Sequence, residues 1–367
     1  LSSPPPELAT QAQRLLARAV LEQARFEEAR KLCEELHQCC TTEFGSDHPE
    51  TARAAAALAV AVWKGADKQN DPQLFTPAEP PLLKHLGQQH PDTLEFLGDY
   101  AVFCSRKGDL SQSERRNLEL LNLFTQVLDT DHDTVLVTRN NLATVYYKMN
   151  RLDDALSQLE KVHQGYVRRY SPDYRGALAV RSGMAAIYHS QGKLEPAEQI
   201  YRECLAVVEK KYGPQSIYVG RYANQLAENL FHQGKLTEAE MYFTRVLELN
   251  SQVKPPPEPV LLENRLNLVQ VYQKAGKHRQ ALEYLNQIRS SSYLERLPIY
   301  RQALVALLFV ETLQALGEKA ETASLLDRCL ELLARDAQAQ PAAYAPSSER
   351  EKLRSRAEQL RKLAPDK

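Results

Sequence analysis

The sequence of 367 residues is poor in glycine and has almost no net charge. It holds 14 glycines and 6 cysteines, and its 46 basic and 47 acidic residues leave a net charge of -1. Few glycines argue against glycine-rich loops that cradle phosphates. Balanced charge argues against a nucleic-acid-binding protein, which usually carries a basic excess. The abundant residues are alanine, leucine, glutamate, glutamine and arginine, all strong helix formers.

Motifs of catalysis and cofactor binding are also missing. The sequence contains no GxxxxGK[ST], GxGxxG, HExxH or GxSxG pattern. Its cysteines form no CxxC pair and no Cys/His spacing typical of zinc sites. They are Cys33, Cys39, Cys40, Cys104, Cys204 and Cys329. We therefore expect no enzymatic activity, no cofactor and no metal.

Long apolar runs are absent as well. The longest candidate, residues 54–63, is alanine-rich and far shorter than the roughly 20 residues that cross a bilayer. We expect no membrane insertion and a cytoplasmic location. The chain begins at Leu1 rather than methionine, so we expect a trimmed or processed chain whose targeting segment lies outside this sequence.

An internal repeat determines the predicted fold. Ala155, Ala197, Ala239 and Ala281 follow one another at a step of 42 residues. Residues suited to a left-handed turn recur at the same step: Gly108, Asn150, Gly192, Gly234 and Gly276 form this series, and the last four each precede one of these alanines. Apolar residues before and after each turn recur at helical spacing, as in Leu142 with Tyr146. Each unit therefore reads as helix, turn, helix.

A second marker separates the units. His48-Pro49 and His90-Pro91 stand 42 residues apart, and later junctions carry His132, Pro172, Pro214 and the run of prolines at 255–257. Proline suits the first turn of a helix but cannot continue one. We interpret the junction histidines as capping or turn residues rather than as metal ligands or bases.

This pattern resembles the tetratricopeptide repeat, and the 42-residue step with its Gln-Gly-Lys-Leu and His-Pro-Asp segments resembles the kinesin light chain-type subclass. The resemblance implies an all-α, right-handed superhelical solenoid of about eight helix-turn-helix hairpins, closed by a C-terminal capping helix. Residues 7–92 are divergent repeats, residues 93–335 are regular repeats, and residues 336–367 form a loop and the cap. We expect one solenoid over residues 1–367.

Two segments depart from the repeat. Between residues 64 and 81 four prolines preclude a full second helix, so we expect an irregular loop and a short helix near residues 81–86. In residues 304–316 the polar residues of the first helix give way to Val305, Leu308 and Phe309. Ser348 should cap a charged terminal helix whose polar face closes the stack.

Function should lie on the inner surface that the first helices of the repeats form. Extrapolating from the core register, this predicted wall carries Asn140, Asn141, Thr144, Tyr147, Lys148, Ser182, His189, Arg221, Asn224, Gln225, Glu228, His232, Asn267, Gln270 and Lys274. Amides and hydroxyls can donate to and accept from a peptide backbone. Asparagine is unfavourable inside helices, which favours binding over mere solvation.

We therefore predict a non-catalytic scaffold that binds a protein or an extended peptide and no nucleic acid. The alternative is a regulatory or sensor domain of a larger signalling protein that binds an internal segment or a small signal. A third reading, an accessory subunit that scaffolds an enzyme, stays open. The sequence does not specify the oligomeric state.

Overall fold

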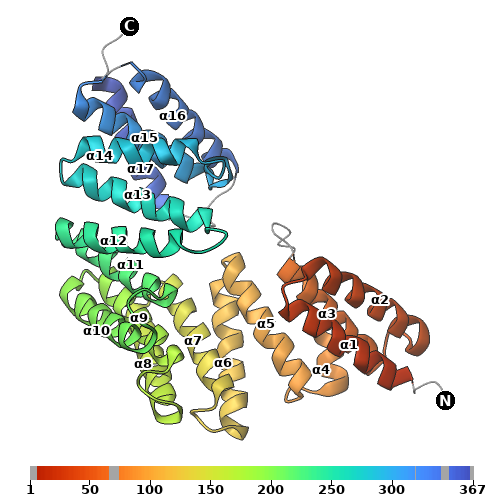
Figure 1. Cartoon of the computed structure of the whole chain (residues 1–367). Coiled ribbons are helices and arrows are strands. Elements are labelled where there is room, and N and C mark those ends of the chain that lie inside the picture. Colours follow the sequence, from red (N-terminus) through yellow and green to blue (C-terminus); the bar gives the residue numbers. More distant parts are fainter. Residues whose placement is uncertain (1–5, 66–73, 319, 340–346, 364–367) are drawn as a thin grey trace. The chain divides into compact units, whose positions relative to one another are not determined.

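The computed structural model describes residues 6–65, 74–318, 320–339 and 347–363, and these residues contain helices and no strands. Sixteen of the helices pair into eight hairpins, and a last helix follows them (Figure 1). The all-α architecture of stacked hairpins is therefore confirmed. Residues 1–177 and residues 178–367 form two compact units, which we describe separately. The single solenoid over residues 1–367 stays a prediction.

The hairpins follow one another in chain order. Those of the first unit are α1 (Pro6–Glu22) with α2 (Phe26–Phe44), α3 (Pro49–Gly65) with α4 (Glu79–Leu86), α5 (Pro91–Lys107) with α6 (Leu110–Val127), and α7 (Asp133–Lys148) with α8 (Leu152–Arg169). Helix α9 (Arg175–Ser190) starts just before the boundary. The second unit continues with α10 (Leu194–Tyr212), α11 (Ile217–His232), α12 (Leu236–Ser251), α13 (Glu258–Lys274), α14 (His278–Ser290), the short 3₁₀ helix η2 (Leu294–Arg296), α15 (Ile299–Leu316), α16 (Thr322–Ala339) and α17 (Ser347–Leu363).

The turns inside the hairpins have the backbone that the repeat predicts. Gly108, Gly192, Gly234 and Gly276 have φ between 73° and 87°, and Asn150 has φ 60°. Ala24 occupies the same repeat position in the first hairpin and has φ 59°, a left-handed conformation that costs an L-residue about 1–2 kcal/mol. The first hairpin thus keeps the turn without the residue that suits it.

The junction histidines are helix caps, as predicted. The Nδ1 atoms of His48, His90 and His132 accept hydrogen bonds from the backbone N–H two residues ahead, at 3.1–3.3 Å. Each imidazole satisfies one of the N–H groups that the first turn of a helix leaves without a partner. Their recurrence is explained by this local role.

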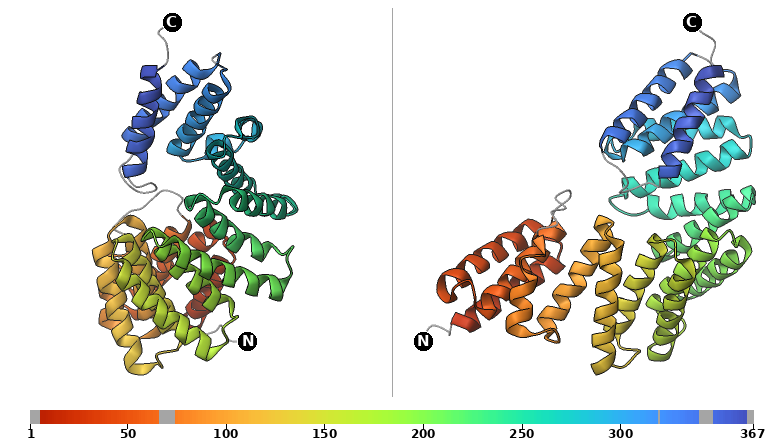
Figure 2. Two further views of the ribbon diagram at one scale, coloured as in Figure 1. Left: turned by 90° about the vertical axis from the view of Figure 1, so that its left-hand side faces the viewer. Right: turned by 180° about the vertical axis from the view of Figure 1, so that it is seen from behind.

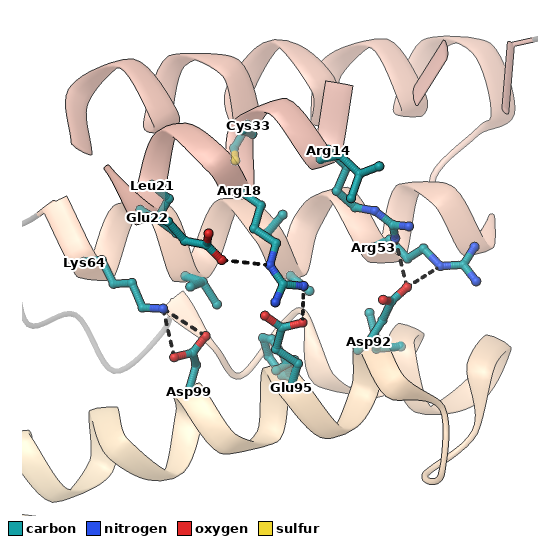
Figure 3. A pocket seen from close by; sticks show the side chains of 17 residues that line it. Arg14, Arg18, Leu21, Glu22, Cys33, Arg53, Lys64, Asp92, Glu95 and Asp99 are labelled. Carbon is teal, nitrogen blue, oxygen red and sulfur yellow. Dashed lines mark hydrogen bonds and ion pairs between the residues drawn. The ribbon is translucent and has the colours of Figure 1, made fainter. Parts of the chain in front are cut away.

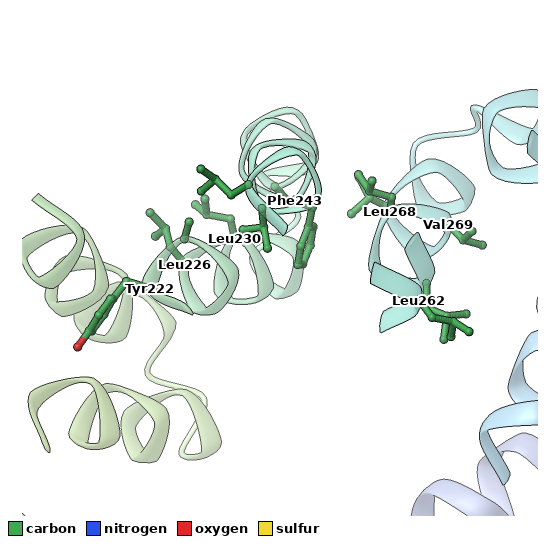
Figure 4. Packing of buried hydrophobic residues seen from close by; sticks show 14 of the residues in the cluster. Tyr222, Leu226, Leu230, Phe243, Leu262, Leu268 and Val269 are labelled. Carbon is green, nitrogen blue, oxygen red and sulfur yellow. The ribbon is translucent and has the colours of Figure 1, made fainter. Parts of the chain in front are cut away.

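The core of each hairpin depends on a small residue at the helix crossing. Ala155, Ala197, Ala239 and Ala281 are fully buried. In the second unit large side chains fill the space between successive hairpins, among them Leu226, Leu230, Phe243, Leu262 and Leu268 (Figure 4). Small residues thus bring the paired helices together, and large ones join neighbouring pairs.

The irregular segment of the second hairpin is compensated by an aromatic insertion. Helix α4 has only eight residues and starts at Glu79, close to the predicted short helix; residues 66–73 of the predicted loop lie outside the described residues. Phe75 is fully buried and packs against Trp63, Phe96, Tyr100 and Phe103, with ring centroids 4.8–6.0 Å apart. One ring therefore supplies part of the apolar surface that a longer second helix would bury.

Ion pairs connect one hairpin with the next at a constant sequence separation. Arg151 pairs with Glu114, Lys235 with Glu198 and Lys277 with Glu240, each across 37 residues at 2.6–2.7 Å. Lys235, Arg202 and Gln233 lower the pKa of Glu198 to about 2 against the opposing effect of burial. These pairs repeat because the hairpins repeat.

Helix α15 is the most apolar helix in the described part of the chain, not the run at residues 54–63. Its 18 residues have the length and mean hydropathy, 1.3, of a membrane span, yet half of that stretch is buried in the protein. Val305, Leu308 and Phe309 lie in the core, as expected from the loss of polar residues there. Membrane insertion is therefore not required to explain this helix.

The last helix covers the end of the stack. Helix α17 lies against α15 and α16 (Figure 2). Its Leu353, Ala357 and Leu360 pack against apolar side chains of these two helices. Arg356 pairs with Glu311 and Arg350 with Asp336, 2.9 Å apart in the latter pair. The helix thus has one apolar stripe and a charged outer surface, as a capping helix requires.

Candidate peptide-binding pocket

A polar pocket of about 660 Å³ opens between α11, α13 and α15 in the second unit. Five residues of the predicted wall line it: Arg221, Asn224, Gln225, Glu228 and Asn267. Along α11 these residues recur at intervals of three or four, so they share one face of the helix. Val246 and Asn250 of α12, both buried, also line it. The pocket is therefore lined by three first helices together with the second helix α12.

Two buried amide atoms in this pocket have no hydrogen-bond partner among the described residues. They are Oδ1 of Asn224 on α11 and Nδ2 of Asn264 on α13. Asn264 is only 4% exposed. A buried polar group without a hydrogen bond costs about 1–3 kcal/mol. One of these atoms is an acceptor and the other a donor, the complement of a peptide group.

The pocket's charged groups are only partly neutralised. Arg301 of α15 pairs with Glu263 of α13 at 3.4 Å. Arg221 is exposed and has no ion-pair or hydrogen-bond partner among the described residues. Because its guanidinium keeps all its donors, Arg221 is available to an acidic or carbonyl group.

Apolar side chains stand at the edge of the same pocket. Ile217 at the start of α11 is 51% exposed, and Val260 near the start of α13 is 43% exposed. Both lie one to two helical turns before the polar groups of their helices. A ligand that crosses this pocket therefore meets an apolar edge as well as amides and charges.

Ser182 does not lie on an exposed surface. Its side chain is fully buried, and its hydroxyl donates to Oε1 of Gln225 at 2.5 Å. The small serine fits between neighbouring first helices and orients the amide that lines the pocket. Its predicted direct contact with a ligand is thus incompatible with its burial, and its role here is to position Gln225.

The two predicted lysines are engaged in joining repeats. Nζ of Lys148 donates to the carbonyl oxygen of Ser105 at 2.9 Å, and Nζ of Lys274 donates to that of Phe231 at 3.2 Å. Each lysine satisfies a carbonyl that the last turn of the preceding first helix leaves unpaired. Burial and the neighbouring charge of Arg106 lower the pKa of Lys148. Arg221 is therefore a better ligand group than either lysine.

The two predicted histidines contact each other. The rings of His189 and His232 are 4.8 Å apart in an edge-to-face arrangement. Burial, reinforced by His232 and opposed by Glu228, lowers the pKa of His189. Glu228 lines the polar pocket, whereas neither histidine does.

The remaining predicted residues are placed as follows. Gln270 is half-buried on α13, outside the pocket. On α7 in the first unit, Asn140 and Asn141 are half-buried, Thr144 is exposed and donates to the Asn140 carbonyl at 3.0 Å, and Tyr147 is 45% exposed. The α7 residues belong to the other compact unit and are not part of this pocket.

Sequence reasoning missed Asn264, Arg301 and Val260. Asn264 occupies the repeat position that Ala54, Phe96, Val180, Tyr222 and Ala306 fill elsewhere. The sequence could have indicated Asn264 as a binding residue, because it places an amide at a repeat position that is otherwise mainly apolar. Arg301 and Val260 carry no comparable signal, because exposed charged and apolar residues are common on helices.

Metal-binding geometry is not present in the described ranges, where no three histidine, cysteine, aspartate or glutamate side chains converge. Five cysteines are buried and Cys39 is half-buried. Burial raises the pKa of the Cys104 and Cys204 thiols to about 11. These thiols therefore serve packing rather than nucleophilic chemistry.

The tetratricopeptide repeat model matches residues 8–69, 92–166, 153–210, 174–252 and 218–291. No curated protein sequence matches the chain significantly. Among solved structures, the apo form of RapI is 11% identical over 97% of this chain and 99% of its own, with a TM-score of 0.64.

Two further structures extend this similarity. A Rap protein complexed with competence and sporulation factor is 14% identical over 98% of this chain and 97% of its own, with a TM-score of 0.54. Kinesin light chain repeats from Podosopora anserina are 20% identical over 55% of this chain and 95% of their own, with a TM-score of 0.48. Since the family model matches well over half of the sequence, the chain belongs to the tetratricopeptide repeat family.

Proposed function

We propose that this protein is a non-catalytic scaffold that binds an extended peptide segment of another protein in the polar pocket of α11, α13 and α15. The observation that carries the proposal is the pair of unpartnered buried amide atoms, Oδ1 of Asn224 and Nδ2 of Asn264. An extended backbone presents both N–H and C=O groups, the donor and the acceptor that Oδ1 of Asn224 and Nδ2 of Asn264 lack.

The pocket also suggests which peptides bind. Arg221 offers donors to an acidic side chain, while Ile217 and Val260 offer apolar surface one or two turns away. A segment with an acidic residue close to an apolar residue complements both features. The amide contacts bind the backbone and tolerate many sequences, whereas Arg221 and the apolar edge select among them.

A second candidate is a regulatory domain whose pocket binds an internal segment or a small signal. The complex of a Rap protein with competence and sporulation factor supports it by analogy of fold alone. The same amide pair would serve that ligand. The two candidates differ in where the bound segment comes from, not in the pocket.

The test is selection of a random peptide library on the whole chain, followed by titration of the enriched peptides. We expect Asn224→Ala with Asn264→Ala to weaken binding at least about tenfold, because each lost hydrogen bond costs about 1–3 kcal/mol. Alanine is native at the position of Asn264 in other repeats, so folding should survive. Asn141→Ala, a first-helix amide in the other unit, is the matched control and should bind normally.

Methylating single backbone nitrogens of the best peptide sharpens this test. One methylation should weaken binding to the native chain about tenfold or more, since it removes the N–H that donates to Oδ1 of Asn224. No enrichment, or equal affinity for the native chain and the double variant, would reject the polar pocket as the site.

A further inference from the structure

A second cavity, in the first unit, has a different lining from the polar pocket. It lies between α1, α3 and α5 and has a volume of about 210 Å³ (Figure 3). Its apolar floor includes Ala17 and Leu21 of α1, Ala56, Ala57 and Val60 of α3, and Phe96 of α5. Most of these side chains are buried. We call this space the apolar cavity.

Every charged group that lines the apolar cavity is paired with another one. Three carboxylates on one face of α5 meet cations from α1 and α3: Asp92 meets Arg14 and Arg53, Glu95 meets Arg18, and Asp99 meets Lys64, at 2.8–3.1 Å. Glu22, the remaining acid, also pairs with Arg18. An ionic ligand would have to break one of these pairs, so the lining favours an uncharged ligand.

Small side chains on α3 leave the space open. Ala56 and Ala57 stand at the repeat positions that hold Asn140 and Asn141 on α7, and Asn224 and Gln225 on α11. Each alanine lacks the volume and the polar atoms of its counterparts. The floor therefore offers water few hydrogen-bond partners and suits an apolar molecule, while the charged side chains that line the rest of the cavity pair with one another.

The ion pairs cross over this floor. Arg18 on α1 reaches Glu95 on α5, and both side chains are about half exposed, whereas Ala17 and Val60 are buried beneath. A side chain attached to a partner's backbone would displace such a pair, but a free small molecule need not. Exposed pairs contribute only about 0–1 kcal/mol, so they can open transiently to admit it.

We propose that the apolar cavity binds a free, uncharged, ring-sized apolar molecule. An apolar cavity of about 150 Å³ accommodates benzene, and drug-sized ligands need about 300 Å³ or more. A space of about 210 Å³ thus fits one aromatic ring system or a compact aliphatic molecule. This site is independent of peptide binding in the other unit.

Titrating the whole chain with indole, an uncharged probe, tests the proposal. We expect saturable binding, with magnetisation transfer from indole to the methyl groups of Ala17, Ala57 and Val60. Ala57→Leu fills the space and should weaken indole binding about tenfold or more. Asn141→Leu places the same side chain at the equivalent position of α7 and should leave indole binding unchanged.

A chemical control keeps the test decisive even where Ala57→Leu fails to fold. Indole-3-acetate has the same ring but carries a charge, and it should bind the native chain about tenfold more weakly than indole, because its carboxylate must break an ion pair. Absence of saturation up to the solubility limit of indole, or methyl contacts outside the three helices, would overturn the proposal. So would equal binding of the charged and uncharged probes.

Discussion

Arg53 and Arg221 occupy the same position of the repeat, on α3 and α11, yet their surroundings differ. Arg53 donates to Asp92 at 2.8 Å and to Glu50 at 2.5 Å, and it is mostly buried. Arg221 is exposed and has no partner among the described residues. The repeat determines where a side chain points, and its neighbours decide whether that side chain stabilises the stack or remains available to a ligand.

The largest expected effect is a difference in folding stability between variants of these two arginines. Arg53→Ala should lower the free energy of unfolding by about 2 kcal/mol, because it removes hydrogen bonds to two carboxylates. Arg221→Ala should leave the melting temperature within error and weaken the binding of acidic peptides. Thermal melts of both variants, beside a peptide titration, measure the contrast. Equal destabilisation by the two changes would show that Arg221 has a structural role too.

The hairpin turns give a second contrast, between the turn that joins α1 to α2 and the turn that joins α11 to α12. Ala24 and Gly234 hold one repeat position, with φ 59° and 78°. Ala24→Gly should stabilise the chain by about 0.5–1 kcal/mol, since glycine adopts positive φ without a steric penalty, although it also loosens the unfolded chain.

Gly234→Ala is the reciprocal change and should destabilise by about 1 kcal/mol. No atom lies within 4 Å of a β-carbon added there, so the effect isolates backbone strain from steric clash. Chemical denaturation of the two variants tests the pair. Shifts of the same sign would contradict the shared turn conformation.

The smallest effect concerns pH. His189 has a lowered pKa in the folded chain, because of burial and of His232. The unfolded chain therefore protonates this histidine at a higher pH than the folded chain does. The stability that this pKa difference contributes above about pH 6.5 is lost as the pH falls through the folded-state pKa. His189→Gln should lose less of its melting temperature between pH 7.5 and pH 5.5 than the native chain. An identical pH dependence would exclude a contribution from this histidine.

Much of the fold followed from the periodic residues. The 42-residue step predicted the turns, the buried alanines and the histidine caps, because each depends on local backbone chemistry. Phe75 could not be placed, since its burial depends on the aromatic side chains of α3 and α5, which meet it only in three dimensions.

The candidate site could be predicted less completely from the sequence. The register placed Arg221, Asn224 and Asn267 beside one pocket, because helical spacing fixes which residues share a face. It could not show that Ser182 is buried or that Lys274 reaches a carbonyl of the preceding first helix. Such outcomes depend on side-chain length and on the distance between helices, neither of which a periodic pattern contains.

The lysine contacts have a consequence for how the chain is synthesised. Lys148 completes the end of α5, and Lys274 completes the end of α11, from 43 residues further along. A helix made early therefore keeps an unsatisfied end until one more repeat has emerged. Because each of these two helix ends is completed within one repeat of the sequence, folding can proceed behind the ribosome one hairpin at a time. A stalled chain should then fray only in its newest hairpin.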